Sequence, residues 1–200
     1  DRIALARPGY VAYRNTLRAL HLEPVEIACG PDTRFQLTAA QLQGLDPAPA
    51  GVIIASPANP TGTIIPDAEL AAIAEVCRAR NIAIVSDEIY HGLSYVGPTP
   101  SMLQFAPDAV VINSFSKYWS MAGWRLGWLL VPEDRIDAAR AYIGNMFLTP
   151  PSLSQHAGLV AMDATDELEG HIQTYARNRQ LMLEALPALG LRKIAPPDGA

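Results

Sequence analysis

Short apolar runs rich in Val and Ile alternate along this 200-residue chain with segments whose apolar residues recur at helical spacing. Runs of this length are typical of buried strands, and strands that alternate with helices favour a largely parallel sheet covered by helices. We therefore predict an α/β fold with three layers and a mostly parallel sheet. The expected strands are 3–6, 51–55, 82–85, 109–112 and 126–131.

The helices are expected between these strands and after the last of them. Pro66 suits a first helical position, and Asp67 and Glu69 complement the positive end of the helix dipole. Further helical patterns cover 135–142, 155–162 and 167–186. We expect residues 1–165 to form a large domain that lacks its amino-terminal part. Residues 166–200 should form a long helix that leads into a smaller, incomplete carboxyl-terminal domain.

Both ends of the sequence look like the interior of a longer chain. The first expected strand begins without a preceding turn or cap, and the last five residues, Pro-Pro-Asp-Gly-Ala, are turn-forming residues with no element after them. We therefore expect this chain to be a fragment, or the ordered part, of a longer protein.

Composition argues against several classes of partner and compartment. The net charge of −5 provides no basic excess that could neutralise phosphates, so we expect neither nucleic acid nor an anionic membrane surface as a partner. No apolar run reaches the length of a membrane-spanning helix, and the start does not resemble a signal peptide. Cys29 and Cys77 lie far apart and form no CxxC pair, so reduced thiols in the cytoplasm are the simplest expectation.

Polar clusters directly follow three of the expected strands. They lie near positions 59, 87 and 117, each just past the carboxyl end of a buried run. Because open α/β sheets bind ligands outside the carboxyl ends of their strands, we expect one pocket to gather these residues.

Lys117 is the residue in these clusters with the most distinctive surroundings, since small hydroxyls and aromatic rings flank it. Partial burial would lower the pKa of its amine and make it available for Schiff-base chemistry. Ser114, Ser116 and Arg125 offer hydroxyl donors and a planar guanidinium that suit a phosphate. Spacing alone leaves a purely structural lysine as an alternative.

Three motifs resemble one known family. The segment Ser114-Phe-Ser-Lys-Tyr-Trp-Ser-Met-Ala-Gly-Trp-Arg-Leu-Gly127 resembles the cofactor-attachment signature of class I and II aminotransferases, which are fold-type I pyridoxal-phosphate enzymes. Asn59-Pro-Thr-Gly62 is similar to the family's Asn-Pro-x-Gly turn, and Asp87-Glu-Ile-Tyr90 to its Asp-x-x-Tyr element. The order and separations of the motifs agree with the family over nearly the whole chain.

The resemblance implies catalytic roles for three residues. Lys117 would bind pyridoxal phosphate covalently and then act as general base and acid. Asp87 would pair with the protonated pyridine nitrogen, which makes the ring a stronger electron sink. Tyr90, together with Asn59, would hydrogen-bond the phenolic oxygen of the cofactor and tune the pKa of its linkage to the lysine.

The remaining implied roles concern cofactor binding. Ser114, Ser116 and Arg125 would hold the phosphate, and Tyr10 matches the position where the family stacks an aromatic ring on the pyridine. The alternative for Tyr10 is an ordinary half-buried aromatic, and the residues alone, without the resemblance, favour a loop cap for Asp87. His91, which follows the Asp-x-x-Tyr element, is expected to be structural. No metal site is expected.

The resemblance implies an aminotransferase that moves an amino group between an amino acid and a 2-oxo acid, as a homodimer. Two alternatives remain open: a C–S β-lyase that uses the same cofactor, and an aminotransferase-like sensor domain of a transcriptional regulator. The family's upstream glycine-rich phosphate loop, its partner-supplied tyrosine and its substrate-binding arginine near the carboxyl terminus are not found in these 200 residues. The substrate is therefore not predicted.

Overall fold

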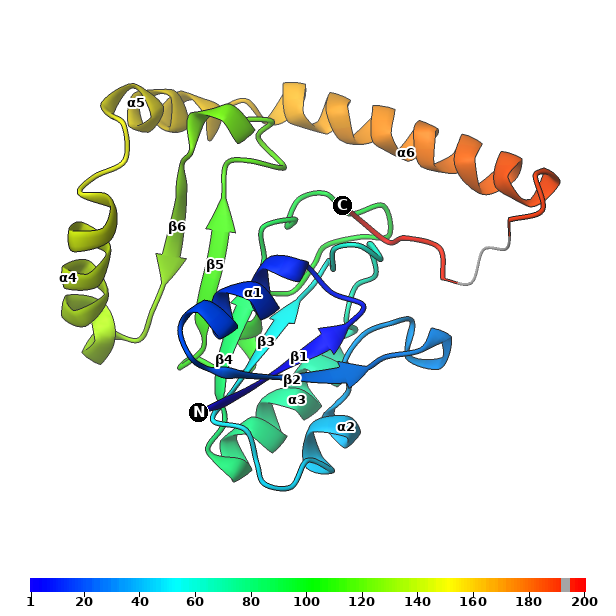
Figure 1. The fold of residues 1–200 in the computed structure, drawn as a ribbon. Helices are drawn as coiled ribbons and strands as arrows, with labels where there is room; N and C mark the ends of the chain where they lie inside the picture. The colour runs from blue at the N-terminus through cyan, green and yellow to red at the C-terminus, as the bar shows by residue number, and fades with distance from the viewer. Residues whose placement is uncertain (192–194) are drawn as a thin grey trace.

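The computed structural model describes residues 1–191 and 195–200, which form a twisted six-stranded sheet with helices around it (Figure 1). The order of strands across the sheet is β2-β1-β3-β4-β5-β6. Each strand is parallel to its neighbours except β6, which runs antiparallel to β5. The strands are β1 (Arg2–Arg7), β2 (Glu23–Ala28), β3 (Gly51–Ala55), β4 (Ala83–Asp87), β5 (Val110–Ser114) and β6 (Gly127–Leu130). The predicted α/β fold with a mostly parallel sheet is confirmed.

Six α-helices accompany the sheet. They are α1 (Val11–Ala19), α2 (Ala39–Gln43), α3 (Asp67–Arg80), α4 (Ile136–Phe147), α5 (Ser152–Ala161) and α6 (Thr165–Ala188) in the described part of the chain. Figure 1 shows α1 in front of the sheet and α2 and α3 next to each other beyond it, while the long α6 extends from α5 across the top of the view. None of these helices is both long and apolar enough to cross a membrane.

The main hydrophobic core lies between α3 and the sheet. Leu70, Ile73 and Cys77 of α3 are buried against Val52 and Ile84 of the central strands. Each such aliphatic side chain contributes about 1.5–3 kcal/mol when it leaves water. This packing fixes α3 on one face of the sheet, so the carboxyl ends of β3 and β4 are held by a rigid layer.

The first fifty residues contain three elements that the sequence patterns did not predict, namely α1, β2 and α2. The edge strand β2 contains Pro24, and proline is tolerated at a sheet edge because it lacks the N–H that a central strand needs. Only Leu17 of α1 is buried, and most of the nine residues of this short helix are small, polar or charged, so no apolar run marks it in the sequence. The helix predicted at 135–142 continues to Phe147, and that predicted at 167–186 spans Thr165–Ala188.

Candidate functional site

The three polar clusters lie together because β3, β4 and β5 are parallel neighbours. Ala55 pairs with Asp87, and Asp87 pairs with Ile112, so the strands end almost level with one another. The segments that follow carry Asn59, Tyr90 and Lys117 respectively. The expectation that these positions share one pocket is therefore met at this edge of the sheet.

The antiparallel strand β6 brings a further residue to the same edge. Ser114 at the end of β5 pairs with Gly127 at the start of β6, which places Arg125 beside the end of β5. A side chain at position 127 would put its Cβ 2.7 Å from the carbonyl oxygen of Asn113, so this close pairing requires glycine. Arg125 adopts a left-handed backbone conformation with φ of 52°, which turns the chain into the strand.

A cavity of about 300 Å³ lies at this edge. Its lining includes seven of the eight residues predicted from the sequence, all except Ser114, and adds Tyr13, Ile89 and Ala122. The seven are Tyr10, Asn59, Asp87, Tyr90, Ser116, Lys117 and Arg125. A volume of this size lies at the lower end of the range for small-molecule sites.

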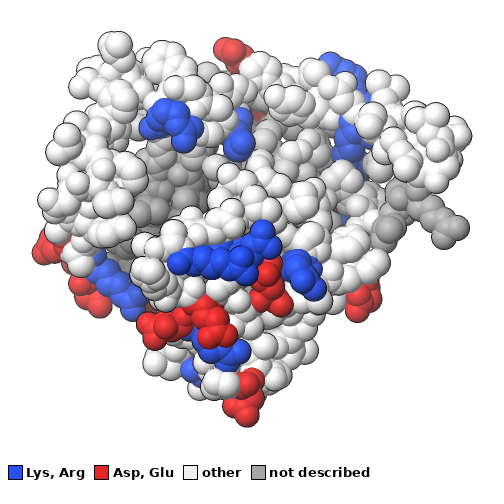
Figure 2. Space-filling model, in the orientation of Figure 1, with Lys and Arg blue, Asp and Glu red and all other residues white. Residues whose placement is uncertain are grey.

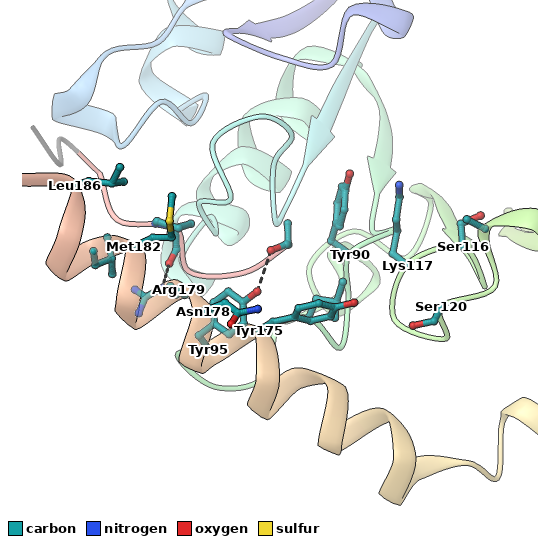
Figure 3. A pocket seen from close by; sticks show the side chains of 15 residues that line it. Tyr90, Tyr95, Ser116, Lys117, Ser120, Tyr175, Asn178, Arg179, Met182 and Leu186 are labelled. Atoms are coloured by element: carbon teal, nitrogen blue, oxygen red, sulfur yellow. Dashed lines mark hydrogen bonds between the residues drawn. The ribbon is translucent and has the colours of Figure 1, made fainter. Parts of the chain in front are cut away.

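Lys117 and Tyr90 stand side by side at the junction of this cavity with a larger one (Figure 3). The Lys117 Nζ atom lies 5.6 Å from the centroid of the Tyr90 ring. The partial burial that the sequence suggested for Lys117 is wrong for the described residues, because this side chain is exposed. The reason is positional: Lys117 lies in the turn beyond β5, where the described chain provides no layer above it.

A tight aromatic cluster fixes the turn that carries Lys117. Phe115 is buried, and its ring centroid lies 4.9 Å from that of Trp119 and 5.2 Å from that of Trp128. On the other side of the lysine, the Tyr118 hydroxyl donates to Glu169 of α6 at 3.1 Å. The backbone on both sides of Lys117 is therefore anchored, while its amine stays free to reach the cavities.

Asp87 is held in place by two donors. The backbone N–H of Ile89 donates to Oδ1 at 3.1 Å, and the hydroxyl of Tyr13 donates to Oδ2. Tyr13 is a site residue that the sequence reasoning missed. The available signal was its spacing of three from Tyr10 at the start of α1, because residues three apart lie on the same face of a helix.

Burial is the main cause that raises the pKa of the Tyr13 hydroxyl above its usual value, and the negative charge of Asp87 and the hydrogen bond to it act in the same direction. The Tyr13 hydroxyl therefore remains protonated throughout the neutral range. It can only donate to Asp87, which favours a carboxylate held in one orientation toward the cavity.

Asn59 and Tyr10 form two further parts of the wall. The Asn59 amide donates to the Tyr90 hydroxyl at 3.4 Å, which is a long hydrogen bond that leaves both groups able to contact a ligand. The ring of Tyr10 meets that of Tyr13 edge to face, with centroids 5.5 Å apart. Tyr10 thus presents an exposed aromatic ring at the mouth of the cavity.

Ser114, Ser116 and Arg125 form a donor-rich corner. The Ser114 Oγ atom lies 2.8 Å from Ser116 Oγ and accepts from the Ser116 backbone N–H at 3.0 Å. Ser114 lines a neighbouring hollow of about 490 Å³, to which Ser116 and Arg125 also contribute. The Arg125 guanidinium donates to the carbonyl of Ala122 at 2.8 Å. The three predicted phosphate-binding residues therefore line this hollow together, and two of them, Ser116 and Arg125, also line the 300 Å³ cavity.

The donors and acceptors of this site suit pyridoxal phosphate. The Asp87 carboxylate would match a protonated ring nitrogen, the Ser116 hydroxyl and the Arg125 guanidinium would match a phosphate, and the Lys117 amine lines the same cavity. Among the described residues no group of His, Cys, Asp and Glu side chains could hold a metal ion. Acidic and basic side chains are interspersed over the lower half of the face shown in Figure 2.

Comparison with known proteins identifies the family. The sequence profile of the family described as aminotransferase class I and II matches residues 1–200. The chain belongs to this family. Its members depend on pyridoxal phosphate, which agrees with the donor set around Lys117.

Relatives within the aminotransferase family match the whole chain. The valine–pyruvate aminotransferase of Mycobacterium tuberculosis is 53% identical, and the aspartate aminotransferase of Geobacillus stearothermophilus is 33% identical. In each case 100% of this chain matches 53% of the relative. The chain therefore spans about half the length of the curated relatives it matches.

Solved structures of aminotransferases share this fold. An aminotransferase from Mycobacterium tuberculosis, 52% identical, superposes with a TM-score of 0.96 over 100% of this chain and 53% of that chain. The aspartate aminotransferase of Thermus thermophilus with maleate, 30% identical, gives a TM-score of 0.92 over 100% of this chain and 54% of its own.

Replacing Tyr13 tests how Asp87 is held. Tyr13→Phe in the full-length protein should lower the free energy of unfolding at pH 7 by about 1–3 kcal/mol, because Oδ2 loses its donor. Above pH of about 10 an unfolded tyrosine ionises while the folded Tyr13 stays protonated, so the wild type loses stability and the difference narrows. Urea denaturation at pH 7 and at higher pH measures both effects.

The matched control is Tyr175→Phe, since Tyr175 lies exposed on α6 and the described residues offer its hydroxyl no hydrogen bond. That change should leave the free energy of unfolding unaltered at both pH values. Equal behaviour of the Tyr13→Phe and Tyr175→Phe proteins would contradict the proposed hold on Asp87.

Proposed function

We propose that the full-length protein is a pyridoxal-phosphate-dependent aminotransferase that transfers an amino group from an amino acid to a 2-oxo acid. The observation that carries this proposal is the arrangement of Lys117, Asp87 and Arg125 around one cavity in a chain of the aminotransferase family. The carboxylate lies at the end of β4, whereas the amine and the guanidinium both lie in the connection between β5 and β6, and the sheet brings the two segments to one edge.

Asp87 controls the charge of the cofactor ring in this proposal. Pyridoxal phosphate, when bound, supplies an electron sink that stabilises negative charge at the substrate α-carbon. Asp87 supports a positive charge on the ring nitrogen, because an adjacent carboxylate favours the protonated form. Tyr13 and the Ile89 N–H keep the carboxylate oriented toward the cavity while it does so.

In this proposal Lys117 binds the cofactor covalently and later serves as the general base and acid for the α-carbon proton of the substrate. Its exposed Nζ stands next to the Tyr90 ring; once the substrate amine had displaced it from the cofactor, it would be free to take the proton of the substrate α-carbon and to return it at C4′. Tyr90 and Asn59 direct their hydroxyl and amide at the phenolic oxygen, and their mutual hydrogen bond supports this common direction.

The other residues orient the cofactor. Ser114, Ser116 and Arg125 hold the phosphate with hydroxyls and a fixed positive charge. The exposed ring of Tyr10 stacks on the pyridine face, a contact worth about 1 kcal/mol. Together these residues fix the ring so that the proton transfer by Lys117 occurs at a defined distance.

The larger cavity next to Lys117 supports a preference for an aliphatic amino acid. It measures about 690 Å³, and α6 contributes apolar side chains to its wall, among them Met182, Leu183 and Leu186 (Figure 3). Arg179 of the same wall is held by the protein, since its Nε donates to the Pro197 carbonyl at 2.6 Å and its guanidinium lies 5.6 Å from the centroid of the Tyr95 ring. A charged substrate side chain would lose hydration against the apolar wall. The 53% identical relative, named for valine and pyruvate, points the same way.

A substrate comparison tests both the reaction and this preference. We expect full-length protein loaded with pyridoxal phosphate to transfer the amino group of valine to pyruvate. Its kcat/KM for valine should exceed that for aspartate by about 10-fold or more, because aspartate brings a carboxylate against apolar residues. Coupled assays that quantify both the amino-acid and the 2-oxo-acid product measure this ratio.

The controls separate the two parts of the proposal. Asp87→Ala should slow every amino-acid pair by orders of magnitude, since several kcal/mol of charge stabilisation are lost. A preference for aspartate would contradict the aliphatic substrate alone. Release of ammonia and pyruvate from sulfur amino acids without amino transfer would contradict the aminotransferase and identify a β-lyase.

We also propose a domain division for the protein: residues 1–165 belong to a large domain, and residues 166–200 begin a smaller one.

The protein is further proposed to work as a homodimer in the cytoplasm. The buried free thiols of Cys29 and Cys77 are consistent with a reducing compartment. The large exposed apolar side chains of α4 and α5 support a subunit interface, because soluble monomers seldom expose several large apolar side chains on two consecutive helices. They include Met146, Phe147, Leu153, Leu159 and Val160.

Light scattering of the full-length protein at micromolar concentration tests the interface. The mass should be twice that of the chain, and the double change Leu153→Glu, Leu159→Glu should give monomers, because two buried unpaired charges oppose association. The control Leu20→Glu changes an exposed leucine beyond α1 and should leave the dimer intact. A monomeric, active wild type would contradict the homodimer.

A further inference from the structure

Two titratable side chains lie directly behind the segment that carries Asp87 and Tyr90, outside the lining of the 300 Å³ cavity. The Glu88 side chain is 5% exposed and that of His91 is 17% exposed. Burial of this kind is costly for a carboxylate unless the surrounding groups satisfy it. Their contacts show how this cost is offset.

Glu88 is almost completely satisfied by its neighbours. Its Oε1 atom accepts from the hydroxyls of Ser86 at 3.1 Å and Ser101 at 3.0 Å, and from the backbone N–H of Met102 at 2.8 Å. Its Oε2 atom faces the Nδ1 atom of His91 at 3.3 Å. Glu88 therefore fixes the position of the imidazole relative to β4.

The other nitrogen of His91 reaches a different strand segment. Its Nε2 atom lies 3.1 Å from the carbonyl oxygen of Ser56, the residue that follows β3 and precedes the Asn59 turn. Ser56 is itself fixed, since it is buried and its hydroxyl accepts from the Ile65 N–H at 2.9 Å. The imidazole thus bridges the chain beyond β4 to the chain beyond β3.

The His91 contacts lie just beyond the point where the backbone pairing of β3 with β4 ends. The last paired residues of β3 and β4 are Ala55 and Asp87. Beyond them the Ser56 N–H donates to the Asp87 carbonyl at 3.4 Å, and the Asn59 amide to the Tyr90 hydroxyl also at 3.4 Å. Both contacts are long, so they specify the spacing of the two segments only loosely.

Both imidazole nitrogens face oxygen acceptors, Glu88 on one side and the Ser56 carbonyl on the other. A protonated imidazole donates to both, whereas a neutral imidazole carries one N–H and donates to one of them. Burial lowers the pKa of His91, while the charge of Glu88, the Ser56 carbonyl and the charge of Asp87 act against this shift. The Ser56 carbonyl receives an N–H from the protonated ring and from the neutral tautomer with its proton on Nε2.

We propose that the Glu88–His91 pair is a positioning device that sets the spacing between the Asn59 turn and the Asp87–Tyr90 segment. It thereby determines how well Asn59 and Tyr90 together contact the phenolic oxygen of the cofactor. This inference rests on the proposed function of the site, but the cross-link itself belongs to the protein without cofactor. His91 is accordingly a positioning residue and touches neither cofactor nor substrate.

Three replacements of His91 separate its two hydrogen bonds. His91→Gln places an amide donor near the original Nε2 position and can keep the bond to Ser56, whereas His91→Asn reaches only the Nδ1 position, toward Glu88. His91→Phe removes both bonds but retains a ring of similar size. The exposed His21 provides the control His21→Gln.

The first readout is the pH midpoint of the visible absorbance change of bound pyridoxal phosphate in the full-length protein. The Asn and Phe replacements of His91 should shift this midpoint by about half a pH unit or more, because the contacts to the phenolic oxygen change. His91→Gln and His21→Gln should keep the wild-type midpoint. A wild-type midpoint in all variants, or the same shift for Gln as for Asn, would overturn the proposal.

The second readout uses the cofactor-free full-length protein. Amide hydrogen exchange of the segment 56–63 should be faster by about 10-fold in the Asn and Phe variants than in the wild type and in His91→Gln, since the cross-link is lost. Unchanged exchange would overturn the positioning role. If His91→Phe fails to fold, the Gln–Asn comparison still decides. Absence of bound cofactor in the wild type would instead contradict the proposed function and leave the exchange test in force.

Discussion

The parallel pairing of β3, β4 and β5 is the constraint on which the rest of the structure depends. Backbone hydrogen bonds hold Ala55, Asp87 and Ile112 level across three neighbouring strands, so the segments that follow emerge at one edge. The antiparallel β6 then adds Arg125 to that edge, in a pairing that only glycine at position 127 permits. Strand pairing therefore brings residues that are far apart in the sequence to the same edge of the sheet.

Regular backbone pairing stops at the ends of the strands, and beyond them side-chain contacts hold the segments in place. Tyr13 holds Asp87 from α1, the aromatic cluster around Phe115 anchors the turn of Lys117, and His91 links the segments after β3 and β4. Each of these groups lies behind or beside a residue that would contact the cofactor. Supporting contacts of this kind hold a reactive geometry more tightly than loops alone can.

Much of the site could be predicted from the sequence, because its strands are continuous apolar runs and its polar residues follow them directly. The strands that contain Val52, Ile84 and Val111 bury these side chains in the core, and in the sequence they are short apolar runs rich in β-branched residues. Such a pattern is weak in β2, an edge strand with Pro24, and in α1, where Leu17 is the buried residue. Tyr13 was missed for this reason, since its role follows from the placement of α1. The exposure of Lys117 depends on which layers surround its turn, and local sequence does not encode this.

The central claim is that the Lys117 amine binds the cofactor, and one measurement addresses it most directly. Full-length protein loaded with pyridoxal phosphate is reduced with borohydride, digested and analysed by mass spectrometry. The account predicts that the cofactor remains attached to a single peptide, at Lys117, and that Lys117→Ala abolishes the attachment. Attachment at any other lysine, or reduction that leaves Lys117 unmodified while the protein transfers amino groups, would contradict it.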